Sequence, residues 1–259
     1  MKGAATLCLL AFASATLAAP SHNDPRFPKT GKEWTPDSLI NPDELGNYFQ
    51  GDIELPLPPQ GRNGLIDERY RWPNGQVAYV FDSAFSAANR AIVQDGMAEY
   101  ASRTGGCITF VERTTESNYV YFTQDNNDGC HSMVGMRGGS QNINYPQWCL
   151  DRWGSVLHEM YHTLGFYHEQ SRYDRDDYVT IMWDNIEEGH EHNFDKYSES
   201  IINGFGEDYD YGSVMHYSAY AFSANNEKTI VTLDPNAVIG QRDDLSQVDL
   251  NKLMNMYNC

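Results

Sequence analysis

The sequence predicts an α+β fold for the part of the chain that follows residue 62. Segments rich in β-branched and aromatic residues predict three strands, at 76–81, 107–112 and 118–123. Apolar residues at helical spacing predict two helices, at 86–106 and 150–165. The presence of both kinds of element in one continuous stretch is what indicates the mixed class.

The last part of the chain predicts an irregular region followed by a helix. Residues 184–240 have weak periodicity and many Asn, Gly, Asp and Tyr residues, so we expect irregular structure there. A helix should begin at Ser246, because Asp249 three residues later completes a variant of the capping box. Leu250 and Leu253 then lie on one face of that helix.

The composition limits the class of protein. The chain has 259 residues, of which 41% are hydrophobic, so it is long and apolar enough to form a core. Its formal net charge is −18, and a chain this acidic repels nucleic acid and anionic membranes. We therefore expect neither a nucleic acid nor a membrane among its partners.

Residues 1–18 have the pattern of a secretory signal peptide. Lys2 precedes a run of small apolar residues, and cleavage near Ala18 fits the residues around it. The run is shorter than the roughly 20 residues that a membrane-spanning helix needs. We expect a soluble product that is secreted; the alternative is a cytosolic N-terminal helix.

Residues 19–62 form a proline-rich segment between the signal and the predicted fold. Eight of the 11 prolines lie in it, a density that excludes long helices and favours an extended chain. It ends in LPLPPQGR, and a basic residue after an exposed proline-rich stretch is a natural site for a trypsin-like cut. The pattern leaves two interpretations open, a flexible linker and a pro-segment removed after Arg62.

Four cysteines remain once Cys8 leaves with the signal: Cys107, Cys130, Cys149 and Cys259. An even number in a secreted chain predicts two disulfides, and the spacing does not choose among the three pairings. The sequence has no Cys-x-x-Cys pair, which makes cysteine a poor choice of metal ligand.

Three histidines give the strongest functional signal. His158 and His162 are four residues apart, so both imidazoles project from the same side of the predicted helix. Gly165 can adopt a positive φ and end the helix, which lets the chain return His168 toward the other two. Three neutral imidazoles leave a fourth metal position open, as in catalytic zinc sites.

Glu159 is poorly placed as a fourth ligand, because it lies about 100° around the helix from His158. It is well placed to take a proton from a water molecule that attacks a carbonyl group. The motif HExxH alone occurs by chance on many helices, whereas HExxHxxGxxH is far rarer. The alternatives are solvated histidines or a histidine-rich metal buffer.

Two motifs together resemble the astacin family of zinc endopeptidases, a family of metzincins. The chain reads HEMYHTLGFYHEQSRYDRD at 158–176 and SVMHY at 213–217, and the resemblance runs from Asn63 to Cys259. It implies a metzincin, or zincin-like, domain with two lobes around an active-site cleft. Such a domain has a twisted N-terminal sheet, an active-site helix, and a mostly irregular C-terminal lobe that ends in a helix.

The resemblance also implies the roles of the site residues. One catalytic Zn2+ is expected on His158, His162 and His168, with Glu159 as the general base. Tyr217 is expected to be a weak fifth ligand in the mature form, which swings away to donate a hydrogen bond to the oxyanion.

A latent precursor is the next implication. FQGD at 49–52 matches the motif FxGD of astacin pro-segments, in which the aspartate binds the zinc, so Asp52 is the expected latency switch. The mature domain would be 63–259, and the new amino group of Asn63 is expected to pair with Glu169 through water.

Structural expectations complete the resemblance. Met215 is expected to form an apolar floor under the zinc, and 130–135 to be an edge strand on which an extended substrate adds. The family pairs its cysteines as Cys107–Cys259 and Cys130–Cys149.

We therefore expect a secreted zinc endopeptidase that acts on protein or peptide substrates. It would be made as a latent monomer and activated by another protease at Arg62/Asn63. The alternative is a secreted zinc-binding interaction protein without catalysis, against which the intact Glu159 argues. Digestive, hatching and matrix-processing roles all remain compatible with the sequence.

Overall fold

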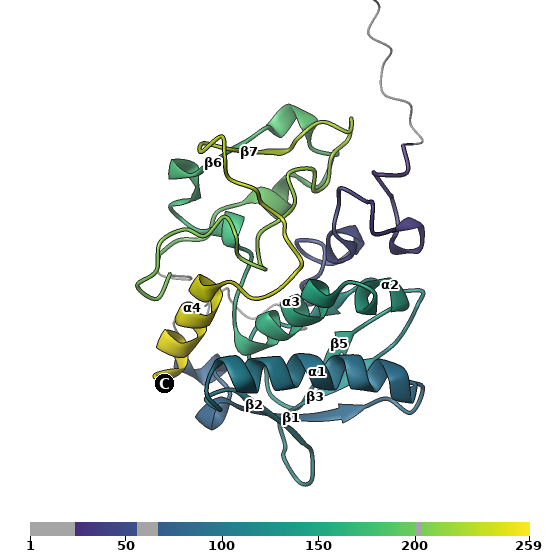
Figure 1. Cartoon of the computed structure of the whole chain (residues 1–259), viewed down its shortest axis with the longest axis vertical. Helices are drawn as coiled ribbons and strands as arrows, with labels where there is room; N and C mark the ends of the chain where they lie inside the picture. Colours follow the sequence, from purple (N-terminus) through teal and green to yellow (C-terminus); the bar gives the residue numbers. More distant parts are fainter. Residues whose placement is uncertain (1–23, 56–66, 200–203) are drawn as a thin grey trace, which may run out of the picture.

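The computed structural model describes residues 24–55, 67–199 and 204–259. The predicted signal peptide at 1–18, and the predicted cut between Arg62 and Asn63, lie outside the described residues. Figure 1 shows two lobes: one holds the larger sheet with helices α1 to α3, and the other holds the short strands β6 and β7.

Five strands form the sheet of the first lobe. They are β1 (Gln76–Phe81), β2 (Thr109–Glu112), β3 (Tyr119–Thr123), β4 (His131–Ser132) and β5 (Ser140–Asn144). Their order is β2-β1-β3-β5-β4, with β4 antiparallel to β5 at one edge and the other neighbouring pairs parallel. The three strands predicted from the sequence are confirmed; β4 and β5 are additional.

Helices α1 (Ala87–Arg103), α2 (Gln147–Leu150) and α3 (Trp153–Leu164) belong to the same lobe. The hydroxyl of Ser86 caps α1 by accepting a hydrogen bond from the Asn89 N–H. At Gly96, an added Cβ would lie 3.3 Å from side-chain atoms of both Val156 and Met160. The small residue therefore lets α1 approach α3 closely, which fixes α3 against the core.

The second lobe has little regular structure, as predicted. Strands β6 (Val179–Ile181) and β7 (Ile230–Thr232) pair antiparallel. The 3-10 helices of this lobe are Glu169–Ser171, Arg175–Asp177, Trp183–Asn185 and Glu191–Phe194. Helix α4 (Gln247–Tyr257) starts after Ser246, and Ser246 and Asp249 form the reciprocal capping box.

Two disulfides link distant parts of the chain, Cys107–Cys259 and Cys130–Cys149. These are the pairs that the resemblance implies. The first connects the end of α4 to the residues just before β2, so the C-terminus is tied to the sheet lobe.

Residues 24–55, called the N-terminal segment below, contact both lobes. The ammonium of Lys32 donates to Asn127 beside the sheet, and that of Lys29 donates to the Ser223 carbonyl in the second lobe. The segment contains the 3-10 helices Gly31–Glu33 and Pro42–Leu45, where an extended chain was expected. Asn41 and Pro42 explain the second one, because a capping residue followed by proline starts a helical turn.

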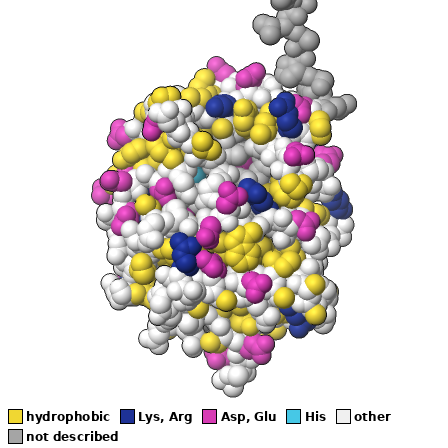
Figure 2. All heavy atoms as spheres, in the orientation of Figure 1, with side chains coloured by type: hydrophobic (Ala, Val, Ile, Leu, Met, Phe, Trp, Pro, Cys, Tyr) yellow, Lys and Arg dark blue, Asp and Glu magenta, His cyan; other side chains and the backbone are white. Residues whose placement is uncertain are grey.

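The surface is acidic on the face seen in Figure 2, where Asp and Glu side chains are spread among fewer Lys and Arg side chains. Within the described ranges, no helix is both long enough and apolar enough to cross a membrane.

Candidate functional site

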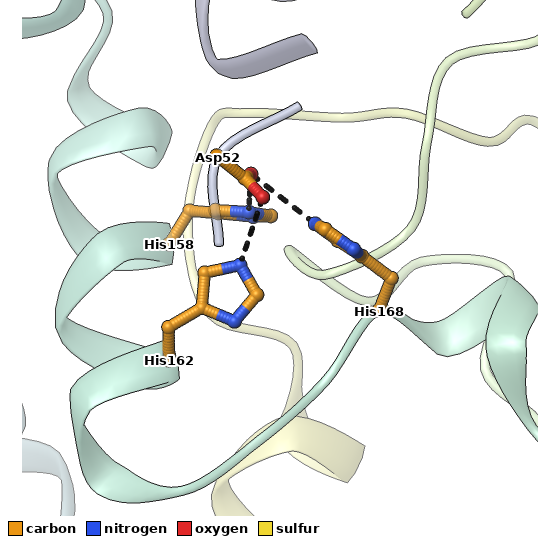
Figure 3. Close-up of side chains that lie close together, drawn as sticks. All are labelled: Asp52, His158, His162 and His168. Carbon is orange, nitrogen blue, oxygen red and sulfur yellow. Dashed lines mark hydrogen bonds and ion pairs between the residues drawn. The ribbon is translucent and has the colours of Figure 1, made fainter. Parts of the chain in front are cut away.

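Helix α3 positions two of the three histidines. From Gly154 to Leu164 each of its residues is buried, so the helix runs through the centre of the molecule. His158 and His162 lie one turn apart on it, and the helix ends at Gly165, which has a φ of 119°. His168 follows three residues later, and its side chain turns back toward the helix, as Figure 3 shows.

Asp52 of the N-terminal segment reaches the space between the three imidazoles (Figure 3). Its Oδ2 lies 2.9 Å from His158 Nε2 and 3.2 Å from His168 Nε2, and its Oδ1 lies 3.5 Å from His162 Nε2. All four side chains are buried, and their donor atoms lie within 4.8 Å of one another. The structure thus brings Asp52 to three histidines that lie more than 100 positions after it in the sequence.

The outer ring nitrogens of the histidines face acceptors. His158 Nδ1 lies 2.8 Å from the Val214 carbonyl, and His162 Nδ1 lies 2.7 Å from the Phe166 carbonyl. His168 Nδ1 lies 3.0 Å from the side-chain oxygen of Gln50. Each acceptor favours the tautomer that carries its proton on Nδ1, which leaves the Nε2 lone pair directed at the common centre.

Burial also favours the neutral form of His158 and His168. It lowers the pKa of His168 to about 3, and it lowers the pKa of His158 below the ordinary value, with the positive charge of Arg242 adding to the effect. A neutral imidazole is the form that binds a metal ion.

The donor set fits a tetrahedral zinc ion. With bonds of about 2.0–2.1 Å, the donor atoms of such a centre lie about 3.3 Å apart, and the three separations given above lie close to that distance. Among the described residues, the buried atoms His162 Nε2 and Asp52 Oδ1 have no hydrogen-bond partner. Two buried and unpaired polar atoms that face one another are what a metal site requires of its ligands.

Glu159 is next to the first histidine and is fully buried. Neither of its carboxylate oxygens has a hydrogen-bond partner in the described part of the chain. Burial, together with the charges of Asp52 and Asp43, raises the pKa of Glu159 well above its ordinary value. A carboxylate whose proton affinity is raised in this way is suited to act as a general base.

A tight loop in the N-terminal segment delivers Asp52. Gln50 has a φ of 53° and Gly51 a φ of 92°, and Ile53 N–H donates to the Phe49 carbonyl across the loop. At Gly51, an added Cβ would lie 3.3 Å from the Asp43 carbonyl, so the glycine permits both the backbone conformation and the close approach.

The same loop covers the edge of the large sheet at β4. Ser132 N–H donates to the Asp52 carbonyl, and Glu54 N–H donates to the Ser132 carbonyl, both at 2.9 Å. Ile53 and Ser132 form a parallel bridge. The N-terminal segment therefore occupies the edge at which the resemblance implies a substrate strand, although the strand there is His131–Ser132 and not the whole of 130–135.

Comparison with known families identifies the family to which this fold belongs. The sequence model of the astacin family of peptidases matches residues 64–258. The chain belongs to the astacin family. Its members are zinc metalloproteases with one catalytic zinc, in agreement with the donor set described above.

Two proteins with similar sequences are a zinc metalloproteinase and a meprin subunit. The chain is 37% identical over 224 residues to zinc metalloproteinase nas-4 of Caenorhabditis elegans, covering 83% of this chain and 70% of that protein. It is 45% identical over 216 residues to meprin A subunit beta of Homo sapiens, covering 82% of this chain. The chain spans only 30% of that longer relative.

Solved structures support the fold. High choriolytic enzyme 1, a hatching enzyme zinc-protease from Oryzias latipes (medaka fish), matches with a TM-score of 0.68 and 36% identity, covering 74% of this chain and 96% of that one. Myroilysin matches with a TM-score of 0.51 at 23% identity, covering 73% and 96%, which shows the fold alone. The predicted astacin-type α+β fold is confirmed.

The two residues expected from the second astacin motif lie near the histidines. The ring of Tyr217 packs against His168, with 4.5 Å between the centroids, and its hydroxyl donates to the Gln50 carbonyl at 2.6 Å. The hydroxyl is therefore engaged by the N-terminal segment. Met215 is buried in this motif, and its carbonyl accepts a hydrogen bond from the Glu169 N–H.

Glu169 has partners that the sequence did not predict. Asn63, its expected partner, lies outside the described residues. In the structure the ammonium of Lys252 donates to both Glu169 oxygens, at 2.7 and 2.8 Å, and the Asp210 N–H donates to one of them. Arg172 adds a weaker contact at 3.4 Å. The only sequence signal for Lys252 is its place in the periodicity of α4, where it lies on the buried side.

Asp249 was predicted only as a cap, yet it also holds the second astacin motif in place. Its oxygens accept from the Ser213 hydroxyl at 2.6 Å and from the Val214 N–H at 2.9 Å. Because the Val214 carbonyl faces His158, this contact connects helix α4 to the histidine cluster.

Proposed function

We propose that this chain is a secreted zinc endopeptidase that is made as a latent precursor. The observation that carries the proposal is the buried cluster of three imidazoles and one carboxylate beside an unpaired glutamate. Membership of the astacin family gives that cluster its chemical meaning.

In this proposal His158, His162 and His168 hold the ion and Glu159 is the general base. When bound, zinc supplies Lewis acidity that polarises the scissile carbonyl and makes solvent more acidic. Glu159 accepts a proton from the attacking water molecule and passes it to the leaving amine. Tyr217, once its hydroxyl is released from Gln50, donates a hydrogen bond to the oxyanion.

Latency follows from the contacts of the N-terminal segment. Asp52 would be a fourth protein ligand of the ion, and the loop around it covers the substrate edge at β4. We assign 1–18 to the signal peptide, 19–62 to the pro-segment and 63–259 to the catalytic domain. An activating protease cuts between Arg62 and Asn63, and the new amino group then joins the environment of Glu169.

Substrates are proteins or peptides that bind as an extended strand on β4, where backbone hydrogen bonds give affinity. The free Ser132 N–H and carbonyl, after departure of the segment, are the groups that receive them. We further propose an extracellular monomer. A silent zinc-binding protein has no need of a buried Glu159 without hydrogen bonds, so no observation favours that alternative.

Cleavage of casein by the purified chain tests this function. Trypsin-processed protein should contain one zinc per chain and should degrade casein, and a zinc chelator such as phenanthroline should remove both the metal and the activity. Added zinc should restore them, and unprocessed protein should be much less active. Activity that ignores both the chelator and the processing would exclude the proposal.

A further inference from the structure

A buried ion pair made by Asp43, and not by Asp52, joins the N-terminal segment to the second lobe. Asp43 lies beside the histidine cluster, with its Oδ2 3.9 Å from His158 Nε2. The guanidinium of Arg242 is 0% exposed and donates to both oxygens of Asp43, through Nε at 3.1 and 3.2 Å and Nη2 at 2.6 Å. Its remaining nitrogen, Nη1, donates to the carbonyls of His216 and Gln241. Each nitrogen of this side chain thereby has an acceptor. Asp43 is the carboxylate that it hydrogen-bonds, and Glu44 Oε1 lies farther away, 3.9 Å from Nη2.

The catalytic domain fixes the backbone of Arg242 and also binds the Asp43 side chain. The Gly154 N–H donates to the Arg242 carbonyl at 2.9 Å, and an added Cβ on Gly154 would lie 2.2 Å from the carbonyl carbon of Arg242. Asp43 also accepts from the hydroxyl of Ser155, the next residue of α3. Arg242 is therefore fixed by its backbone, and it is not free to follow the segment outward.

Glu44, the next residue of the segment, adds a second set of contacts. Its oxygens accept from the Ser218 N–H at 2.6 Å and from the Ser218 hydroxyl at 2.7 Å. It also accepts from Asn41, which closes the 3-10 turn that presents both carboxylates. The turn is thus shaped to place two buried carboxylates against the catalytic domain.

We infer that Asp43 on Arg242 is a second latch of the precursor, separate from Asp52 on the metal. This inference rests on the proposed function, in which residues 19–62 are a pro-segment. A buried guanidinium that loses its carboxylate is strongly penalised, so opening of the segment carries the cost of separating this pair. Two linked contacts on one short segment hold it far more tightly than either does alone.

The second latch is tested in the full-length, zinc-loaded precursor by amide hydrogen exchange. Asp43→Asn keeps the size of the side chain and removes its charge, and it should speed exchange of the Ile53 and Glu54 amides by about 100-fold. Asp52→Asn should also speed it, and the double variant should exceed either. Asp37→Asn, an exposed carboxylate of the same segment, should leave exchange unchanged.

Exchange at α1 amides reports whether each variant remains folded, and it should not change. Arg242→Lys keeps the charge but loses the two-pronged contact, so it should give a smaller acceleration than Asp43→Asn. The inference is overturned if Asp43→Asn matches Asp37→Asn while Asp52→Asn accelerates exchange.

The processed enzymes separate this inference from the proposed function. Processing removes residue 43, so all segment variants should yield the same mature activity. Before processing, Asp43→Asn should have a higher basal activity than Asp37→Asn and the native precursor. Absence of activity in every processed sample would contradict the proposed function, whereas the exchange result would still decide the latch.

Discussion

The two lobes are stabilised by different interactions. In the sheet lobe, β3 and β5 bury Val120, Phe122 and Ile143 completely in one large apolar cluster. In the second lobe the apolar cluster is smaller, and buried polar contacts such as Glu169–Lys252 connect its loops to α4. The first lobe therefore depends on packing, and the second depends on hydrogen bonds and ion pairs made between residues far apart in the sequence.

The largest loss of stability is expected from a substitution in the sheet lobe. Phe122→Ala should lower the free energy of unfolding by about 3–5 kcal/mol, because it leaves a cavity among the aromatic rings of Tyr79, Phe81 and Tyr145. Urea denaturation of the precursor measures this loss. Phe110→Ala, at a half-buried position of β2, should cost clearly less; equal losses would show that the lobe is not held by its buried centre.

The buried carboxyl group of Asp249 should make the stability of the chain depend on pH. Burial raises the pKa of Asp249 from 3.8 to about 6, although the hydrogen bonds from Ser213, Val214 and Ser246 oppose the rise. Between these two values the folded chain keeps a proton that the unfolded chain has lost. The stability that Asp249 contributes is therefore complete below about pH 4 and is lost as the pH rises through 6.

Asp249→Asn measures that effect because asparagine does not titrate. From pH 4 to pH 7, the free energy of unfolding of the native sequence should fall relative to this variant by on the order of 3 kcal/mol. Asp95→Asn, on the exposed side of α1, controls for removal of a charge. A difference that stays flat or grows with pH would show that the buried carboxyl is not the cause.

The ion pair of Glu169 gives a smaller effect. Lys252→Met should cost about 2 kcal/mol, because Glu169 is left buried but keeps Arg172 and the Asp210 N–H. Replacing both partners, Lys252→Met with Glu169→Gln, should recover part of the loss. Lys196→Met, which breaks an exposed pair with Asp176, should cost less than about 1 kcal/mol. Equal losses at positions 196 and 252 would remove the distinction between buried and exposed pairs.

The contrast between the lobes explains how much of the fold the sequence could predict. Strand β1 and the start of α4 match their predicted positions because apolar periodicity and a capping box are local signals. Strand β5 was missed because its sequence, SQNIN, is polar except for Ile143. Strands β6 and β7 have three residues each and lie far apart in the chain, so their pairing has no local signal.

The site divides in the same way. The sequence motifs predicted His158, His162, His168 and Asp52, and the structure brings these residues together. The partners that stabilise the arrangement were missed, because their separations are 83 residues for Glu169–Lys252 and 199 residues for Asp43–Arg242. A charged residue has no local pattern that names its partner, so only the folded chain reveals these contacts.

The central claim is that a metal-binding cluster of imidazoles works with the adjacent carboxylate of Glu159. Its most direct test is the peptidase activity and zinc content of processed Glu159→Gln protein. The claim predicts a fall in kcat/KM of about 10²–10⁴-fold with one zinc still bound per chain, since glutamine cannot accept the proton. Activity within a few-fold of the native enzyme, at unchanged zinc content, would contradict it.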